Sequence, residues 1–188
     1  MEPRAFSQLQ INPREVKPRK RGITEIRGPY YAVMGSRYLT DLLETMGDYV
    51  DGIKYAGGSF ALMPRSRVAE LNNLAHKYSA YVSSGGWIEH VLARDGADGV
   101  KRYLAEAQAL GFDVIELSTG FISLPPDDLV ALVRTVIKAG LKARPELGIQ
   151  FGAGGATPNA EPRPKAPAMY AGSCRRRAAA SMPAPTAS

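Results

Sequence analysis

The sequence has little of what several common kinds of site require. It holds one cysteine, Cys174, and two histidines, His76 and His90, so we predict neither a disulfide framework nor a zinc site. No run of about 18 apolar residues could cross a bilayer, and the first residues lack the apolar stretch of a secretory signal. We therefore expect a soluble, cytoplasmic protein with no membrane partner.

The chain does have the size and composition of a folded domain. Its 188 residues are 45% hydrophobic and 22% charged, enough to bury one sizeable core. The net charge of +6 divides into +4 for residues 1–21, +4 for residues 157–188 and −2 for the stretch between them. Only the basic run 17–21 favours nucleic-acid binding, and such runs are more often solvated leaders, so we predict no nucleic-acid partner.

We predict three segments along the chain. Residues 1–21 form a basic flexible leader, residues 22–156 a partial (βα) barrel domain, and residues 157–188 a low-complexity Ala/Pro/Arg tail. The tail contains nine alanines and six prolines and has neither helical nor strand periodicity, which predicts disorder. One hypothesis for it is an out-of-frame or mis-spliced reading, since these residue types dominate GC-rich frames.

The pattern of residues 22–156 predicts a repeat of strand and helix. Short, mostly apolar or β-branched stretches recur about every thirty residues, the length of one βα unit; they are 22–26, 50–56, 80–84, 113–118 and 141–147. Helical spacing of apolar residues lies between them, most clearly over 129–137 behind two prolines. Gly47, Gly111 and Gly140 are predicted to close three helices in the left-handed conformation.

Repeated βα units predict an α/β fold with a parallel sheet, but periodicity leaves open whether it closes as a barrel or is doubly wound. In both architectures, ligands bind at the carboxyl ends of the strands. The candidate residues there are Lys54, Gly58, Ser59, Gly85, Gly86, Glu116, Ser118, Gly120 and Glu146. Two alternatives remain open: the glycine pairs are simply tight turns, and the lysine and glutamates form a structural ion pair.

Four stretches, GDYVDGIKYAGGS, SSGGWIE, LGFDVIELSTG and GLKARPELG, resemble the phosphosulfolactate synthase family, which includes a plant heat-stress-associated branch. The resemblance covers about residues 17–156. It implies a (βα)8 TIM-type barrel, here truncated to about five βα units. It also implies a lyase that adds sulfite to phosphoenolpyruvate with Mg²⁺, giving (2R)-phospho-3-sulfolactate for coenzyme M biosynthesis.

The resemblance also implies roles for the candidate residues. Lys54, Glu116 and Glu146 would be catalytic, and Glu116 and Glu146 would hold Mg²⁺, because a hard cation prefers oxygen ligands. The phosphorylated substrate would be bound by residues of the βα turns, namely Gly58, Ser59, Gly85, Gly86, Ser118 and Gly120. Glu89 also stands where the family pattern has a like residue.

The chain departs from the sulfite-adding members in two places. Ile149 and Gln150 follow PELG where those members have lysines, and Arg27 with Gly28 and Pro29 replaces an acidic and a basic residue after the first strand. The alternative is therefore a non-catalytic, stress-associated barrel relative that acts by protein interaction. A five-unit sheet would also leave apolar surface uncovered, so we expect inactivity in this form and poor solubility or dependence on a partner; homo-oligomerisation is left open.

Overall fold

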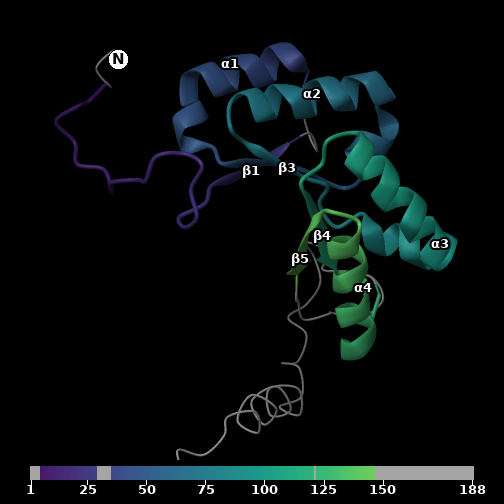
Figure 1. Ribbon diagram of the computed structural model, residues 1–188. Coiled ribbons are helices and arrows are strands. Elements are labelled where there is room, and N and C mark those ends of the chain that lie inside the picture. The colour runs from purple at the N-terminus through teal and green to yellow at the C-terminus, as the bar shows by residue number, and fades with distance from the viewer. Residues whose placement is uncertain (1–4, 29–34, 121, 147–188) are drawn as a thin grey trace, which may run out of the picture. The chain divides into compact units, whose positions relative to one another are not determined.

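The computed structural model describes residues 5–28, 35–120 and 122–146. Strands and helices alternate along this part of the chain (Figure 1). The strands are β1 (Glu25–Gly28), β2 (Gly52–Tyr55), β3 (Tyr81–Ser83), β4 (Val114–Ser118) and β5 (Lys142–Glu146). The α-helices are α1 (Ser36–Met46), α2 (Arg65–Lys77), α3 (Ile88–Ala109) and α4 (Pro126–Lys138), and two short 3₁₀ helices, η1 (Gly47–Tyr49) and η2 (Ser59–Leu62), lie beside β2.

The strand order decides between the two architectures that periodicity left open. All five strands are parallel and lie in the order β1-β2-β3-β4-β5, so each pairs with its neighbour in sequence. A doubly wound sheet reverses its strand order at a switch point, whereas a (βα)8 barrel adds its strands in sequence. The described fold is thus the α/β, barrel-type arrangement that the sequence predicts, with five strands joined by four α-helices in the described part of the chain.

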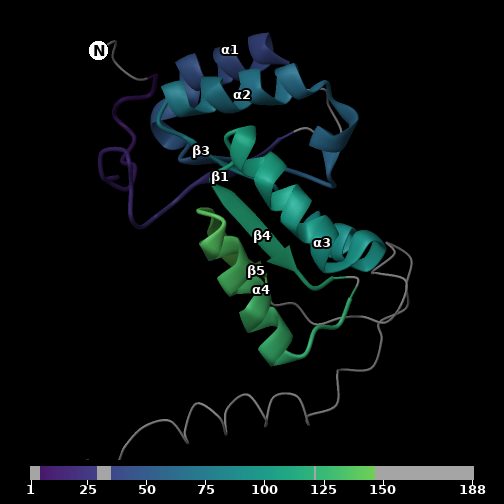
Figure 2. The same cartoon turned by 45° about the vertical axis from the view of Figure 1, so that its right-hand side comes forward.

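The hydrophobic core lies between the sheet and its helices. Side chains alternate along each strand, and one set packs with the helices: Ile53, Tyr55, Val82, Ile115 and Leu117, each at most 2% exposed. All four α-helices contribute buried residues to this same cluster. Helices α1 and α2 lie side by side over it in both ribbon views (Figure 2). The helices therefore cover one face of the sheet, as in a barrel.

The opposite face of the sheet is polar and strongly curved. Arg144 of β5 binds Glu25 of β1, with Nη1 and Oε2 2.5 Å apart. In a flat sheet, four strand spacings would put β1 about 19 Å from β5, farther than these two side chains reach together. The sheet therefore curls around this inner face.

Two local predictions need correction. The first strand is shifted from 22–26 to Glu25–Gly28, because the Thr24 amide donates to the Asp51 carboxylate and so lies outside the strand ladder. Gly47 has φ −57°, so it is not left-handed: the chain continues into η1 instead. Gly111 (φ 81°) and Gly140 (φ 78°) are left-handed, as predicted.

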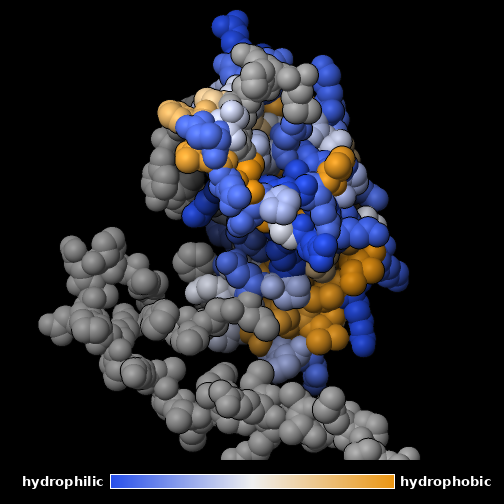
Figure 3. All heavy atoms as spheres, turned by 90° about the vertical axis from the view of Figure 1, so that its left-hand side faces the viewer, coloured by the Kyte–Doolittle hydropathy of each residue, from blue (hydrophilic) through white to orange (hydrophobic). Residues whose placement is uncertain are grey.

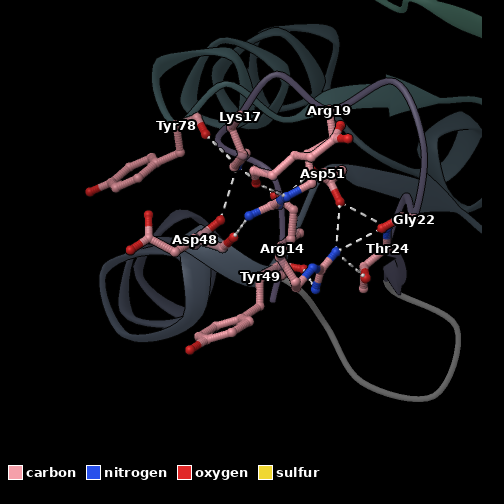
Figure 4. A network of polar contacts seen from close by, with 12 residues as sticks. Arg14, Lys17, Arg19, Gly22, Thr24, Asp48, Tyr49, Asp51 and Tyr78 are labelled. Carbon is pink, nitrogen blue, oxygen red and sulfur yellow. Dashed lines mark hydrogen bonds and ion pairs between the residues drawn. The ribbon is translucent and has the colours of Figure 1, made fainter. Parts of the chain in front are cut away.

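The described residues of the basic leader form no helix or strand, but three of their side chains bind the domain at the amino ends of the strands (Figure 4). The Lys17 ammonium donates to the carbonyl oxygens of Gly47, Val50 and Tyr78 at 2.9, 2.5 and 2.7 Å. Burial lowers the pKa of Lys17, more than nearby Asp51 raises it.

Arg14 and Arg19 complete this amino-terminal network. Both form ion pairs with the buried Asp51, at 3.1 and 2.8 Å. Burial raises the pKa of Asp51, but the Thr24 hydrogen bond and the two guanidinium groups outweigh it, so the pKa lies below its ordinary value. These contacts join the leader to the loop before β2.

Helix α4 is the least covered of the helices. Of its predicted apolar stripe only Val136 is fully buried, while Val130 and Ile137 are 46% and 59% exposed. Apolar patches are visible on the face shown in Figure 3. No described helix is long and apolar enough to span a membrane. The predicted tail, 157–188, lies outside the described residues.

Candidate functional site

Lys54, Glu116 and Glu146 lie together on the inner face, at the carboxyl ends of β2, β4 and β5. The Lys54 Nζ lies 2.5 Å from Glu116 Oε2, and Glu116 is only 4% exposed. The Glu116 carboxyl also hydrogen-bonds that of Glu146, which is itself exposed. One cation and two acids from three strands therefore share a single cluster.

Strand alternation explains why Glu116 points away from the helices. Its neighbours Ile115 and Leu117 are both fully buried in the core between sheet and helices. The register pairs Ser118 with Glu146, which brings the carboxyl ends of β4 and β5 to the same level. The cluster thus follows from one polar residue in an apolar strand plus parallel pairing.

The electrostatics of this cluster favour a bound proton or cation. Burial raises the pKa of Glu116, and the neighbouring Glu146 raises it further, while Lys54 opposes both. Two carboxylates within hydrogen-bonding distance cannot both stay ionised without a compensating positive charge. Lys54 supplies part of that charge.

Glu116 and Glu146 fit a magnesium ion by their chemistry. In proteins Mg²⁺ is bound through one or two carboxylates, with water and substrate oxygens completing its shell. Among the described residues, no group of three or more His, Cys, Asp or Glu side chains is placed to hold a metal. The pair therefore fits a magnesium site shared with substrate and not a cage made by the protein alone.

The Gly85–Gly86 turn after β3 lies against this cluster. Gly85 has φ 63°, and a Cβ there would overlap the Tyr55 carbonyl oxygen and lie 3.7 Å from Lys54 Cε. A Cβ on Gly86 would lie 2.6 Å from the Cβ of Ser118 and 3.7 Å from Glu116 Oε1. Only glycine lets the backbone approach this closely. The Gly85 amide donates to Ser83 Oγ at 3.4 Å, which leaves Gly86 as the candidate for binding phosphate at this turn.

The turn after β4 completes this side of the site. The Gly120 amide donates to Ser118 Oγ at 3.3 Å. A Cβ on Gly120 would lie 3.7 Å from Oε1 of Glu89, a buried acid in the first turn of α3. Gly86 therefore lies between Ser118 and the Glu116 carboxylate, and Gly120 lies between Ser118 and Glu89.

Gly58 and Ser59 are placed differently. Gly58 is left-handed (φ 68°), and a Cβ on it would overlap the Trp87 indole ring. Ser59 Oγ is buried and has no hydrogen-bond partner in the described structure. Gly58 thus packs against the Trp87 side chain. The role of both residues in substrate binding stays a prediction.

Glu25, Tyr81 and Arg144 lie on the same inner face, although none of them is among the predicted site residues. Besides its bond to Glu25, Arg144 donates to the Tyr81 hydroxyl at 3.0 Å, and its guanidinium lies 5.3 Å from the centre of that ring. The Tyr81 ring fills the space that Gly52 leaves. Their spacing could have indicated this position for Arg144. It lies two residues before Glu146 on β5, so both side chains face the same side of the sheet.

The sequence profile of the (2R)-phospho-3-sulfolactate synthase (ComA) family matches residues 12–177, a range that runs past the predicted domain end at residue 156. Ile149 and Gln150, where the resemblance predicts a departure from the sulfite-adding members, lie outside the described residues.

Three curated relatives are similar to the chain. Protein HEAT-STRESS-ASSOCIATED 32 of Arabidopsis thaliana is 41% identical over 148 residues, 79% of this chain and 51% of that protein. The phosphosulfolactate synthase of Methanothermobacter thermautotrophicus is 31% identical over 136 residues, 72% of this chain and 51% of the enzyme. The phosphosulfolactate synthase of Methanocaldococcus jannaschii is 26% identical over 113 residues, which are 60% of this chain and 44% of the enzyme.

The chain spans about half the length of these relatives. The family match covers far more than half of the chain, and it agrees with the sequential parallel strands and the polar inner face described above. The chain belongs to the (2R)-phospho-3-sulfolactate synthase (ComA) family.

Proposed function

We propose that the Lys54–Glu116–Glu146 site binds phosphoenolpyruvate with Mg²⁺ and adds sulfite to it. The observation that carries the proposal is the convergence of one ammonium and two carboxyl groups from three strands beside the Gly85–Gly86 turn. Family membership and the two archaeal synthases support the reaction. Because the chain spans half of those enzymes, their activity is carried over here as part of the proposal.

The reaction needs positive charge and a proton at the substrate. Sulfite sulfur attacks the methylene carbon C3 and forms the C–S bond, and the π electrons of C2=C3 move toward C2 and the carboxylate. The Lys54 ammonium stabilises this negative charge and gives its proton to C2, which yields phosphosulfolactate without breaking the phosphate ester. A magnesium ion held by Glu116 and Glu146 would add positive charge opposite the substrate carboxylate.

The other residues bind and orient the substrate. The Gly86 backbone amide would donate to the phosphate, and the Ser118 hydroxyl, which accepts from the Gly120 amide, lies beside it. Glu116, being buried, keeps the Lys54 ammonium fixed at the strand ends. Such positioning by rigid strands is what lowers the barrier of an addition step.

An assay by ³¹P NMR tests the proposal. The 188-residue chain is incubated with phosphoenolpyruvate, sulfite and Mg²⁺, and formation of phosphosulfolactate is followed. Lys54→Met and Glu116→Gln should each reduce the rate at least about a hundredfold. Lys101→Met, at an exposed position of α3, is the matched control and should leave the rate unchanged. Turnover that survives both site variants would exclude these residues as catalytic.

A second candidate is a non-catalytic, stress-associated relative that acts by protein interaction. The observation that favours it is the 41% identity to the plant heat-stress-associated protein. The resemblance described above adds that Ile149 and Gln150 stand where the sulfite-adding members are expected to have lysines. A neutral amide cannot replace an ammonium group opposite a developing negative charge. Binding of phosphoenolpyruvate without formation of phosphosulfolactate, with the protein folded and Mg²⁺ present, would favour this function. Loss of both binding and turnover is the inactivity expected of the five-strand form.

A further inference from the structure

The Ser59 hydroxyl is a buried polar group without a partner. Ser59 follows β2 and is the first residue of η2, and its Oγ makes no hydrogen bond to any described residue. Buried hydroxyl groups are nearly always paired, because burial removes their hydrogen bonds to water. The turn lies at the carboxyl ends of the strands, where ligands bind in this type of fold. The unpaired hydroxyl therefore points to a ligand that it would contact.

The Trp87 side chain covers this turn. Gly58 is buried and left-handed, and a Cβ on it would overlap the indole ring. The indole also packs edge-on against Phe60, with the ring centres 6.5 Å apart. The residues on both sides of Ser59 therefore contact the same indole.

The Trp87 ring is held in part by an exposed residue. It stacks on the imidazole of His90, with ring centres 4.3 Å apart and ring planes inclined by 30°. His90 is exposed, and Trp87 itself is only partly buried against the core. Such stacking between rings adds little stability beyond the area that it buries. The indole can therefore move without opening the core between sheet and helices.

Trp87 also lies beside the proposed phosphate donor. It directly follows Gly86 in the chain, and the register pairs Lys54 with Ser83, so the turns after β2 and β3 begin at the same level. A phosphate bound by the Gly86 amide would lie next to the indole and to the turn that holds Ser59. The oxygens of one phosphate can accept hydrogen bonds from donors on both turns.

We propose that Trp87 is a movable cover over Ser59, and that the substrate phosphate displaces the indole and accepts a hydrogen bond from the Ser59 hydroxyl. The turns after β2 and β3 then bind one phosphate between them, through Ser59 and the Gly86 amide. This inference rests on the proposed function and deepens it, since it assigns phosphate recognition to a displacement of Trp87. Trp87 is a positioning residue and takes no part in the addition of sulfite.

Tryptophan fluorescence reports this movement directly, because the chain holds a single tryptophan. Phosphoenolpyruvate, inorganic phosphate and pyruvate are each titrated into the full chain with Mg²⁺. The two phosphate-bearing probes should shift the emission to longer wavelength, because the displaced indole meets more water, and pyruvate should leave it unchanged. Unchanged emission while calorimetry shows phosphoenolpyruvate bound would overturn the inference and leave the proposed function standing.

Ser59→Ala separates binding from folding. The hydroxyl has no partner in the described structure, so its removal should not lower the midpoint of urea unfolding. It should weaken phosphoenolpyruvate and inorganic phosphate about tenfold, since each loses a hydrogen bond to a charged group, and leave pyruvate unchanged. Ser66→Ala, at an exposed position of α2, is the matched control and should change neither affinity nor stability. A lower midpoint with unchanged phosphate affinity would identify a structural hydroxyl and contradict the inference.

Trp87→Phe tests the cover independently by calorimetry. Phenylalanine keeps an aromatic ring against Phe60 but is smaller, so less has to be displaced, and inorganic phosphate should bind about threefold to tenfold more tightly. Circular dichroism checks that the variant is folded. Unchanged or weaker binding would mean that the indole does not oppose phosphate. A wild type that binds none of the three probes would overturn both this inference and the proposed function.

Discussion

At the scale of single residues, Gly85 sets how closely the backbone approaches the charged cluster. Gly85 combines a positive φ with a contact in which any Cβ would overlap the Tyr55 carbonyl oxygen. Gly22 has a nearly equal φ, 61°, but open space around its Cα. The two positions therefore separate the effect of backbone strain from the effect of a steric clash.

We predict that Gly85→Ala is much more damaging than Gly22→Ala. Both substitutions carry the cost of a left-handed alanine, about 1–2 kcal/mol. Only Gly85→Ala must also displace the backbone beside Lys54, so it should weaken phosphoenolpyruvate binding as well. Urea unfolding and calorimetry measure the two effects. Equal losses of stability and affinity in the two variants would show that the close approach at Gly85 is unimportant.

The buried acid Glu116 makes stability depend on pH. Burial raises the pKa of Glu116 above its ordinary value of 4.5, so the native state binds this proton more tightly than the unfolded state does. The resulting stabilisation is complete below that ordinary value and is lost as the pH rises through the raised pKa.

Comparison with Glu116→Gln isolates this contribution, because glutamine does not titrate. The unfolding free energy of the wild type minus that of Glu116→Gln should decrease from about pH 5 to about pH 8. Urea unfolding at both pH values, in a chelator to remove divalent cations, gives the difference. A difference that increases with pH would mean that Lys54 outweighs burial and lowers the pKa instead.

At the scale of elements, the amino-terminal segment binds the carboxyl ends of two helices. The Lys17 ammonium binds the Gly47 carbonyl at the end of α1 and the Tyr78 carbonyl just after α2. Helix ends leave carbonyl groups without partners inside the helix, and here a lysine from outside satisfies them. This contact also replaces the left-handed glycine that the sequence suggested for α1.

We predict that Lys17→Met lowers the unfolding free energy by about 2 kcal/mol, because it leaves partly buried carbonyl groups without a charged donor. Lys20→Met, at an exposed position in the same basic run, is the matched control and should change stability by less than about 0.5 kcal/mol. Urea unfolding measures both. Equal effects of the two substitutions would show that the Lys17 contacts add nothing beyond general charge.

At the scale of the whole described domain, the Arg144–Glu25 pair joins the first and last strands of the sheet. The two side chains are 38% and 18% exposed, so solvent weakens their attraction but does not remove it. The pair joins β1 and β5, which are not hydrogen-bonded to each other in the described sheet. The two side chains can meet only because the sheet is curved.

A double-mutant cycle tests this link. Glu25→Gln, Arg144→Gln and the double variant should give a coupling energy of about 1 kcal/mol in urea unfolding. We also expect both single variants to weaken phosphoenolpyruvate binding, because the curvature brings Lys54 of β2 to Glu116 of β4. A coupling energy of zero would mean that the pair does not help to curve the sheet.

Much of the fold was predictable because it depends on local chemistry. Short apolar stretches at intervals of one βα unit predicted all five strands, and two prolines ahead of an apolar stripe predicted α4. The strand ends were less predictable. Thr24 and Gly47 are each bound by a distant side chain, Asp51 and Lys17, which no local pattern could indicate.

The sequence by itself determined that parallel strands would present Lys54, Glu116 and Glu146 at their carboxyl ends, because alternation and repeat length are properties of neighbouring residues. Only the tertiary structure decided that the sheet curls so that these three side chains meet, that Arg144 crosses the inner face to Glu25, and that Gly58 packs against Trp87. Contacts between residues far apart in the chain depend on the curvature of the whole sheet, and no short stretch of sequence encodes that curvature.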